Sequence, residues 1–294
     1  MKKLMLIINP VAGRSGYKLN FPDALQTLDS HGFRTTVFYT GAQGDATALV
    51  QSEGEHYDVV ACVGGDGTLS EVMGGLMQLE KRPDLGYFPM GTSNDVATSL
   101  GLPKNDMAGA ALRLAEGVPH PYDVGGMNGR YFAYIAAFGA FTEVSYATPQ
   151  DQKRALGHLA YVLQGMASLG NIVPCHAIVE HDGGVIEGDY LYGSMSNSTS
   201  VAGIVRLPNS MVGLGDGMSE LVLVKNLATP ADLADLASSV LSGRYDSEKL
   251  MILQTRKAHF HFDKPIPWTR DGEDGGSHQD VTLCSYAAPI NFIF

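Results

Sequence analysis

The chain has 294 residues, a formal net charge of −11, an apolar fraction of 45% and 35 glycines. This length predicts about two domains, each large enough to bury a core. The negative charge argues against non-specific binding to nucleic acid and against strong attraction to an anionic membrane surface.

The cysteines and the N-terminal residues indicate an intracellular protein. Cys62, Cys175 and Cys284 lie far apart, without the spacing of a metal site, which is typical of a reduced compartment. Asn9-Pro10 interrupts the first apolar run too early for a signal peptide, and a first strand explains that run better. The sequence contains no run of about 18 apolar residues, so it predicts no membrane-spanning helix.

Residues 1–123 alternate between segments typical of strands and segments typical of helices. Strands are expected at 3–8, 33–39, 58–63 and 87–90. Helices are expected at 22–31, 45–52, 68–79, 95–100 and 106–116. This alternation predicts a parallel sheet with helices on both faces, in which ligands bind beyond the carboxyl ends of the strands.

A glycine-rich turn follows the buried run 59–63: Gly64-Gly65-Asp66-Gly67-Thr68. Glycines there allow backbone conformations and close approaches that a Cβ atom would block. Backbone N–H groups in the turn, with a helix N-terminus behind them, form a seat for phosphate. The alternative is a tight turn in which glycine serves packing alone.

Three polar or glycine-rich turns fall at the ends of predicted strands, at 9–14, 64–68 and 91–95. Because the carboxyl ends of parallel strands share one edge of a sheet, we expect these turns to converge on one ligand. Their convergence predicts the site more strongly than any single turn does.

From about Pro121 the sequence becomes rich in predicted strands. They are expected at 131–138, 175–180, 185–195, 220–224, 251–253, 258–262, 281–284 and 290–294. Residues 127–129 and 182–184 read as hairpin turns, and helices are expected only at 152–170 and 230–242. The fold class is therefore an α/β nucleotide-binding domain, residues 1–123, followed by an antiparallel, β-sandwich-like domain, residues 124–294.

The motifs taken together resemble a known family. Asn9-Pro-x-x-Gly13, Gly64-Gly-Asp-Gly-Thr68-x-x-Glu71 and Gly91-Thr-x-Asn-Asp95 occur in order, followed by Asp216-Gly and Asp271-Gly-Glu273. This set resembles the diacylglycerol kinase catalytic-domain family of soluble bacterial lipid kinases, related to sphingosine and ceramide kinases. The resemblance implies a nucleotide-binding domain, a β-sandwich domain, and transfer of the γ-phosphate of ATP to a lipid hydroxyl in the cleft between them.

The resemblance also implies which residues bind the nucleotide. They are Asn9, Pro10, Gly13, Arg14, Thr40, Gly64, Gly65, Asp66, Gly67, Thr68, Glu71, Gly91 and Thr92. Arg14 is the only cation in the first turn, where it either contacts phosphate or remains a solvated loop charge.

Magnesium sites follow from the same resemblance. Aspartates matching Asp66, Asp95 and Asp123 would organise a magnesium–water network, since Mg²⁺ takes few carboxylates and keeps several waters. A second, structural Mg²⁺ would be held by Asp216 with the backbone carbonyls of Gly213 and Met218. The alternatives are a helix cap for Asp95 and a plain Asp-Gly turn for Asp216.

Asp271 and Glu273 are the candidates for the general base. In an extended segment residues two apart face the same way, which would direct both carboxylates toward one ligand. The resemblance implies that this motif supplies the base, and Glu273 is preferred to Asp271. Asp66 stays a candidate because related sphingosine kinases are thought to use the aspartate of the glycine motif. The alternative is a solvated acidic loop.

Two other functions compete with an ATP- and Mg²⁺-dependent lipid kinase. NAD kinases share Gly-Gly-Asp-Gly-Thr, but their downstream Thr-Gly-Ser-type turn and Asn-Glu pair are not found in this sequence. The second competing function is that of a non-catalytic module that binds a nucleotide or a lipid. The expected partner is a lipid at a membrane surface, reached from the cytoplasm by weak peripheral contact. The sequence leaves the oligomeric state open and allows a homodimer.

Overall fold

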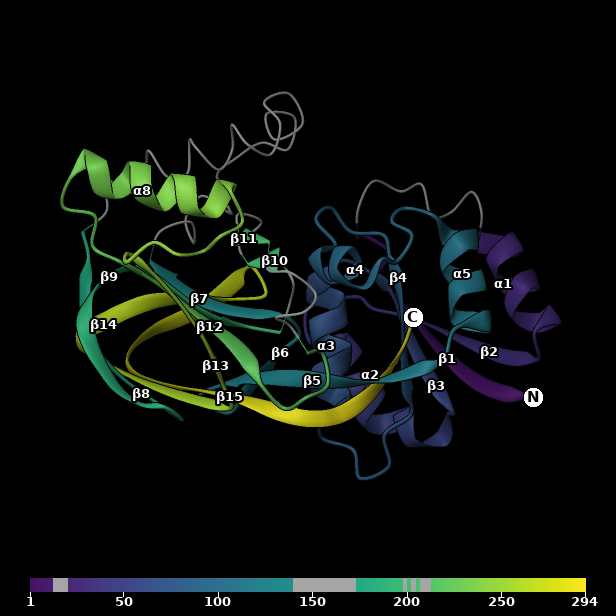
Figure 1. Cartoon of the computed structure of the whole chain (residues 1–294). Helices are drawn as coiled ribbons and strands as arrows, with labels where there is room; N and C mark the ends of the chain where they lie inside the picture. The colour runs from purple at the N-terminus through teal and green to yellow at the C-terminus, as the bar shows by residue number, and fades with distance from the viewer. Residues whose placement is uncertain (13–20, 140–172, 198–199, 202–204, 207–212) are drawn as a thin grey trace.

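The computed structural model describes residues 1–12, 21–139, 173–197, 200–201, 205–206 and 213–294. Its fold is mixed α/β with more strand than helix. An α/β half and a β-rich half lie side by side, and α8 (Pro230–Leu241) crosses above the β-rich half (Figure 1). The expected helix at 152–170 lies outside the described residues.

Four parallel strands form the sheet of the α/β half, in the order β2-β1-β3-β4. Their bounds are β1 (Lys2–Ile8), β2 (Phe33–Tyr39), β3 (Val59–Gly64) and β4 (Asp84–Pro89). The parallel sheet predicted from the alternating pattern is confirmed. Every residue of β3 is buried, as expected for a central strand of a covered sheet.

Helices cover both faces of this sheet. They are α1 (Phe21–Ser30), α2 (Asp45–Glu53), α3 (Asp66–Leu76), α4 (Asp95–Leu100) and α5 (Met107–Glu116), with a short 3₁₀ turn at Gly54–His56. Alternate residues of β1 pack into different cores: Met5 and Ile7 lie with α2 and α3, whereas Leu4 and Leu6 lie with α1 and α5. This alternation follows from the period of two along a strand.

The β-rich half is antiparallel, as expected. Its strands are β5 (Pro119–Met127), β6 (Arg130–Phe132), β7 (Ile135–Gly139), β8 (Cys175–His181), β9 (Gly184–Ser196), β10 (Ser200–Val201), β11 (Val205–Arg206), β12 (Ser219–Lys225), β13 (Leu250–Thr255), β14 (Lys257–Arg270) and β15 (Glu273–Ile293). The long strands β9 and β14 each pair with both β7 and β8, so the sheet curls around one core.

Aromatic rings fill that core. Phe138 lies 4.9 Å from Trp268, 5.0 Å from Phe262 and 5.6 Å from Phe260, measured between ring centroids. Tilted and edge-to-face pairs of this kind contribute beyond the apolar area that they bury. Trp268 anchors the end of β14 immediately before the hairpin turn at 271–272, so this packing fixes the position of the turn.

The two halves share one hydrogen-bonded sheet. β15 runs for 21 residues, pairs with β14 and β5, and meets β4 in parallel at Phe292 and Leu85. The separate strands expected at 281–284 and 290–294 are therefore parts of one strand, and the strand expected at 131–138 is two, β6 and β7. The proposed division at residue 123 falls inside β5 and stays a prediction. Among the described residues, no helix is long and apolar enough to cross a membrane.

Candidate functional site

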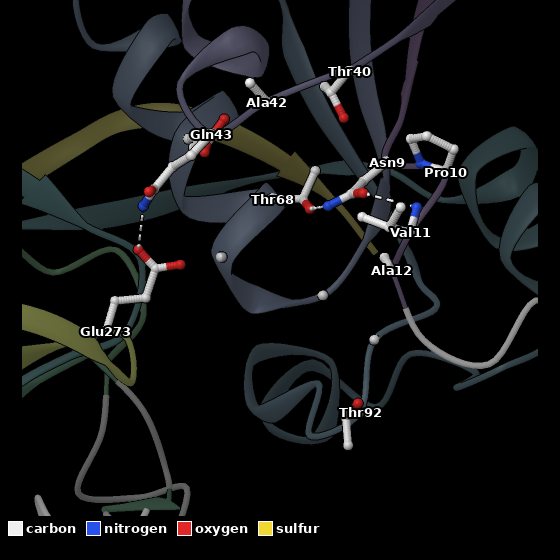
Figure 2. A pocket seen from close by; sticks show the side chains of 15 residues that line it. Asn9, Pro10, Val11, Ala12, Thr40, Ala42, Gln43, Thr68, Thr92 and Glu273 are labelled. Carbon is white, nitrogen blue, oxygen red and sulfur yellow. Dashed lines mark hydrogen bonds between the residues drawn. The ribbon is translucent and has the colours of Figure 1, made fainter. Parts of the chain in front are cut away.

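A pocket of about 570 Å³ lies at the carboxyl ends of the four parallel strands (Figure 2). The turns after β1, β2, β3 and β4 all contribute to its wall, so the expected convergence of turns is confirmed. Glu273, the first residue of β15, lines it from the β-rich half. The lining comprises Asn9, Pro10, Val11, Ala12, Thr40, Gly41, Ala42, Gln43, Gly65, Gly67, Thr68, Glu71, Gly91, Thr92 and Glu273.

Asn9 ties the first turn to the third. Its Nδ2 donates to Thr68 Oγ1 at 3.1 Å, and its Oδ1 accepts from the Val11 amide at 3.1 Å (Figure 2). Thr40 is buried at the end of β2, where its amide donates to the Ile8 carbonyl. Gly13 and Arg14, expected to continue this wall, lie outside the described residues.

The glycine turn after β3 leads directly into α3. The first amides of an α-helix have no intrahelical partner, and among the described residues no side chain caps this helix at Gly65. The amides of Asp66, Gly67 and Thr68 are therefore open to a ligand. A Cβ atom on Gly91 would collide with the Gly65 backbone, which shows how closely the two turns pack. Free amides and the helix dipole make this end of α3 suited to an anion.

Asp66 is more buried than a ligand-facing surface turn would leave it, with 9% of its surface exposed. Its carboxylate accepts hydrogen bonds from the amides of Asp95 at 3.0 Å and Val96 at 3.3 Å, and thereby caps α4. Burial, followed by the nearby charge of Asp95, raises the pKa of Asp66 to about 6. Asp66 thus shapes the site by joining the third and fourth turns.

The alternative role of Asp95 as the cap of its own helix is wrong, because Asp66 accepts the hydrogen bonds from the first amides of α4. Asp95 is half-buried, and the Tyr134 hydroxyl donates to its Oδ2 at 3.3 Å. The residue before it, Asn94, is fully buried and holds the turn: its Oδ1 accepts from the Gly91 amide and its Nδ2 donates to the Gly91 carbonyl. Asn94 was part of the recognised motif, but sequence reasoning gave it no role.

Glu71 is also a structural acceptor. Its two carboxylate oxygens accept from the amides of Gly44 at 2.8 Å and Ala46 at 3.2 Å at the start of α2. The side chain lies on the pocket wall, but these contacts direct its oxygens toward α2. Glu71 therefore holds the loop after β2 against α3.

The expectation that Asp271 and Glu273 face the same ligand is wrong. Asp271 and Gly272 form a two-residue turn between β14 and β15, with φ values of 48° and 80°. A turn with positive φ at both positions reverses the chain, so the rule for extended segments does not apply. The two carboxylates point to different places.

Asp271 points inward. Its carboxylate accepts from the amides of Ala133 at 2.6 Å, Tyr134 at 3.0 Å and Ile135 at 3.1 Å, and from the Ser70 side chain. Burial raises the pKa of Asp271, although these hydrogen bonds oppose the shift. A carboxylate with this many donors has no free oxygen for a substrate proton, so we assign it to holding the hairpin.

Glu273 points outward onto the glycine turn. A Cβ atom placed on Gly67 would lie 2.8 Å from Glu273 Oε1, and Gln43 Nε2 donates to Glu273 Oε2 at 3.2 Å (Figure 2). The structure therefore brings together residues separated by about 200 positions in sequence. Gln43 was missed because nothing in its local sequence marks a contact with the far end of the chain.

Asp123 lies with the Asp216 loop. It is fully buried, with Oδ2 accepting from the Gly217 amide at 2.7 Å and Oδ1 from the Ala288 amide. Burial raises its pKa, and Asp216 adds to the shift. Asp123 thus contacts the 213–218 loop, and its expected grouping with Asp66 and Asp95 around magnesium stays a prediction.

Asp216 itself is exposed. Its Oδ1 accepts from the Met218 amide at 2.9 Å, and its Oδ2 lies so close to Gly213 that any side chain there would collide with it. The loop thus packs against this carboxylate through Gly213 and the Met218 amide, and the expected role of the Gly213 and Met218 carbonyls in holding magnesium stays a prediction.

Comparison with known proteins agrees with this geometry. Residues 3–127 match the family model described as the diacylglycerol kinase catalytic domain. A diacylglycerol kinase of Bacillus subtilis is 35% identical over 279 residues, which cover 94% of this chain and 91% of the relative. The chain belongs to this family. It is a lipid kinase.

Further members of the diacylglycerol kinase family are similar in sequence and structure. A diacylglycerol kinase of Staphylococcus aureus is 36% identical over 280 residues, covering 94% of this chain and 87% of the relative. A crystal structure described as a putative diacylglycerol kinase from Bacillus anthracis has a TM-score of 0.81 and 25% identity, covering 100% of this chain and 95% of that one.

Gly67→Ala tests the contact between Glu273 and the glycine turn in this lipid kinase. Gly67 lies in the first turn of α3, where alanine is a better helix former, so stability should be kept or raised. The new methyl group displaces only the end of a flexible side chain, Glu273. We expect kcat to fall about tenfold to a hundredfold while the melting temperature holds. Unchanged kcat would show that the position of Glu273 does not matter.

Glu220 gives a pH-dependent prediction. It is 1% exposed on β12, Gln254 donates to its Oε1 at 3.5 Å, and among the described residues its Oε2 has no partner. Burial, with smaller effects of Asp216 and Asp123, raises its pKa from 4.5 to about 7. Because the folded-state pKa is above the unfolded one, the free energy of unfolding falls as pH rises through this range.

Glu220→Gln removes that titration. The variant should melt at a higher temperature than the parent at pH 8, and the difference should vanish near pH 4.5, both measured in EDTA. A difference that stays constant from pH 4.5 to pH 8 would contradict the inferred cost of the buried charge.

Proposed function

We propose that this lipid kinase transfers the γ-phosphate of ATP to the hydroxyl of a lipid, with diacylglycerol as the acceptor class and Mg²⁺ as the required metal. The observation that carries the proposal is the position of Glu273 on the Gly67 turn, at the edge of the pocket formed by the four strand-end turns. One carboxylate from the β-rich half thus reaches the place where the α/β half is built to hold phosphate.

The α/β half supplies the nucleotide site. The amides at the start of α3 would hold phosphate oxygens, and the closely packed glycines Gly65 and Gly91 let the backbone approach them. Thr40 and Thr92 line the same pocket and would donate hydrogen bonds to the nucleotide. The names of the relatives and the family model support a kinase, and membership of a kinase family implies ATP as the phosphate donor.

The choice of base follows from what each carboxylate already contacts. Asp66 accepts hydrogen bonds from two backbone amides of α4, and Asp271 accepts hydrogen bonds from the three backbone amides of residues 133–135. Glu273 is exposed on the pocket wall, and among the described residues its one hydrogen-bond partner is the flexible side chain of Gln43. We therefore assign the base to Glu273, as the sequence analysis preferred.

In the proposed step, the lipid hydroxyl oxygen attacks the γ-phosphorus of ATP. The new O–P bond forms as the bond from the γ-phosphorus to the β,γ-bridging oxygen breaks, and ADP leaves. The hydroxyl proton passes to a Glu273 oxygen. The protein contributes mainly positioning and charge stabilisation, as is general for phosphoryl transfer.

The residues present fit Mg²⁺ in two places. Asp95 and Asp66 lie close enough for the charge of one to raise the pKa of the other, a repulsion that a divalent cation would relieve. The Asp216 loop offers one carboxylate, with the Gly213 and Met218 backbone beside it. The described residues hold no cluster of three metal-ligating side chains, so these sites would rely on carbonyls and water, as Mg²⁺ sites usually do. Magnesium bound near Asp95 would neutralise the phosphate charge during transfer.

Asp216→Asn tests the structural metal. Mg²⁺ bound only by the folded chain should raise the melting temperature without nucleotide, because a ligand of the folded state stabilises that state. We expect Asp216→Asn to reduce this rise. Asp246→Asn, an exposed aspartate on a different loop, serves as the control and should keep it. If Mg²⁺ raised the melting temperatures of the parent and of Asp216→Asn equally, the metal would not bind at Asp216.

Transfer of label from [γ-³²P]ATP separates the proposal from its alternatives. Dioctanoylglycerol in mixed micelles, NAD and buffer alone are offered to the full chain with Mg²⁺. We expect labelled lipid and unlabelled NAD. Label on NAD would favour an NAD kinase, and ATP binding without any transfer would favour a non-catalytic module. Weak, reversible contact with the micelle or membrane surface belongs to the same proposal, and a homodimer is compatible with it.

A further inference from the structure

A second cavity, of about 600 Å³, begins where Glu273 ends the nucleotide pocket. Gln43, Gly67, Glu71 and Glu273 line both cavities, so the second opens directly beside the proposed base. Its walls come from α2 and α3 on one side and from β6 and the β14–β15 hairpin on the other. The residues that line it alone are Gly44, Thr47, Ser70, Gly74, Gln78, Gly129, Arg130, Tyr131, Arg270 and Asp271.

Two arginines, Arg130 and Arg270, line this cavity from the β-rich half. Arg130 is the first residue of β6 and is exposed, and Arg270 is the last residue of β14 and is half-buried. Neither guanidinium makes an ion pair or a hydrogen bond in the part of the chain that the structure describes. Arginine is always charged and presents donors in a planar fork that matches phosphate and carboxylate.

The acidic side chains of the same wall do not neutralise these arginines by contact. Glu71 is engaged by the amides of Gly44 and Ala46, Asp271 by three amides of the 133–135 segment, and Glu273 by Gln43. Within the described part of the chain, Arg270 is half-buried and its guanidinium donors have no acceptor, so they are available to an anion. An anionic ligand would supply the missing acceptor.

The position of the cavity limits what that ligand is. The strand-end turns of the first pocket hold the donor nucleotide in the proposed function, and the second cavity lies on the other side of Glu273. The group that enters it therefore belongs to the acceptor side. Anionic groups on that side of a lipid phosphotransferase are phosphates of the lipid itself.

We propose that Arg130 and Arg270 form a binding site for a lipid phosphate on the acceptor side of Glu273. The proposal rests on the proposed function, because that function places ATP in the first pocket and the lipid acceptor in the second cavity. The phosphate has two sources with the same chemistry: the phosphomonoester of the product formed from diacylglycerol, or the phosphodiester of an anionic glycerophospholipid acceptor such as phosphatidylglycerol.

Direct binding tests the site without relying on turnover. Dioctanoyl phosphatidic acid is titrated calorimetrically into the full chain without nucleotide or metal. We expect Arg270→Gln to weaken binding about tenfold, because a charge-assisted, bidentate contact to phosphate is lost. Arg130→Gln should weaken it less, since that side chain is more exposed. Arg270→Lys should recover only part of the loss, because lysine keeps the charge but not the planar fork.

Arg256→Gln is the matched control. Arg256 immediately precedes the opposite end of β14, so the substitution removes the same charge far from the cavity. It should leave phosphatidate binding unchanged. Equal affinities of the parent and Arg270→Gln, or no phosphatidate binding by the parent, would overturn the proposal even where lipid kinase activity is present. Absence of transfer to every lipid, with arginine-dependent phosphatidate binding intact, would contradict the proposed function and leave this site standing.

Steady-state kinetics distinguishes the two sources. If the site holds the product, Arg270→Gln should raise the inhibition constant of phosphatidate about tenfold and change kcat/KM equally for dioctanoylglycerol and dioctanoyl phosphatidylglycerol. If it holds an acceptor phosphodiester, the substitution should lower kcat/KM for dioctanoyl phosphatidylglycerol about tenfold relative to dioctanoylglycerol. A fall in kcat for every acceptor with unaltered phosphatidate binding would place the arginines on ATP and overturn the proposal.

Discussion

Glu273→Gln is expected to lower kcat for lipid phosphorylation by about 10²–10⁴-fold, the usual contribution of a general base. The substitution keeps the shape of the side chain and removes the proton acceptor. KM for ATP should change little, because the strand-end turns that hold the nucleotide do not depend on Glu273. Since the residue is exposed, the melting temperature should be unchanged.

Two other variants make this result specific. Glu187→Gln replaces an exposed glutamate on β9 far from the hairpin and should keep full kcat. Asp66→Asn keeps one acceptor for the amides of α4. If Glu273→Gln retained most of its kcat while Asp66→Asn lost it, the base would be Asp66 in the glycine turn, as in related sphingosine kinases, and not Glu273.

Asp271→Asn is expected to destabilise the fold by about 2–4 kcal/mol, because a single amide oxygen replaces a carboxylate that accepts three backbone amides. The positive φ of 48° does not contribute to this loss, since asparagine adopts that conformation readily. The urea midpoint of unfolding measures the effect.

Asp263→Asn is the control for that loss, because Asp263 is exposed on β14. It should change the free energy of unfolding by no more than about 0.5 kcal/mol. If Asp271→Asn were as stable as the parent but lost kcat, Asp271 would be a catalytic residue and its assigned structural role would be wrong.

The α/β half could be predicted from sequence because its signals are local. Apolar runs such as 59–63, followed by glycine turns and capped helices, fix strands, turns and helices within about 30 residues. The convergence of the turns then follows from a general property of parallel sheets. The structure confirms the parallel sheet and the convergence of the turns on one pocket.

The carboxylates could not be assigned from sequence alone, because their environments depend on distant residues. Asp66 contacts α4, 29 positions away, and Asp271 contacts residues 133–135. The sequence rule for Asp271 and Glu273 assumed an extended segment, whereas the pair flanks a two-residue hairpin turn. The contact of Asp123 with Gly217 spans 94 positions, so no local pattern indicated it.

The strands of the β-rich half were also only partly predictable from local sequence. Its strands are recognisable as strands, but their lengths depend on partners that local patterning does not name. β15 is 21 residues long because it pairs in turn with β14, β5 and β4. That continuous pairing places the hairpin with Glu273 against the α/β half, so the site depends on the least predictable part of the fold.

The most direct test of the central claim is the kcat cycle of Gly67→Ala, Glu273→Gln and the double variant. If Glu273 acts from its position on the Gly67 turn, the alanine methyl has nothing left to disturb once the carboxylate is gone. The double variant should then have the kcat of Glu273→Gln alone, within about twofold. Multiplication of the two single losses in the double variant would show that Gly67 and Glu273 act independently, and would contradict the placement of the base on the phosphate turn.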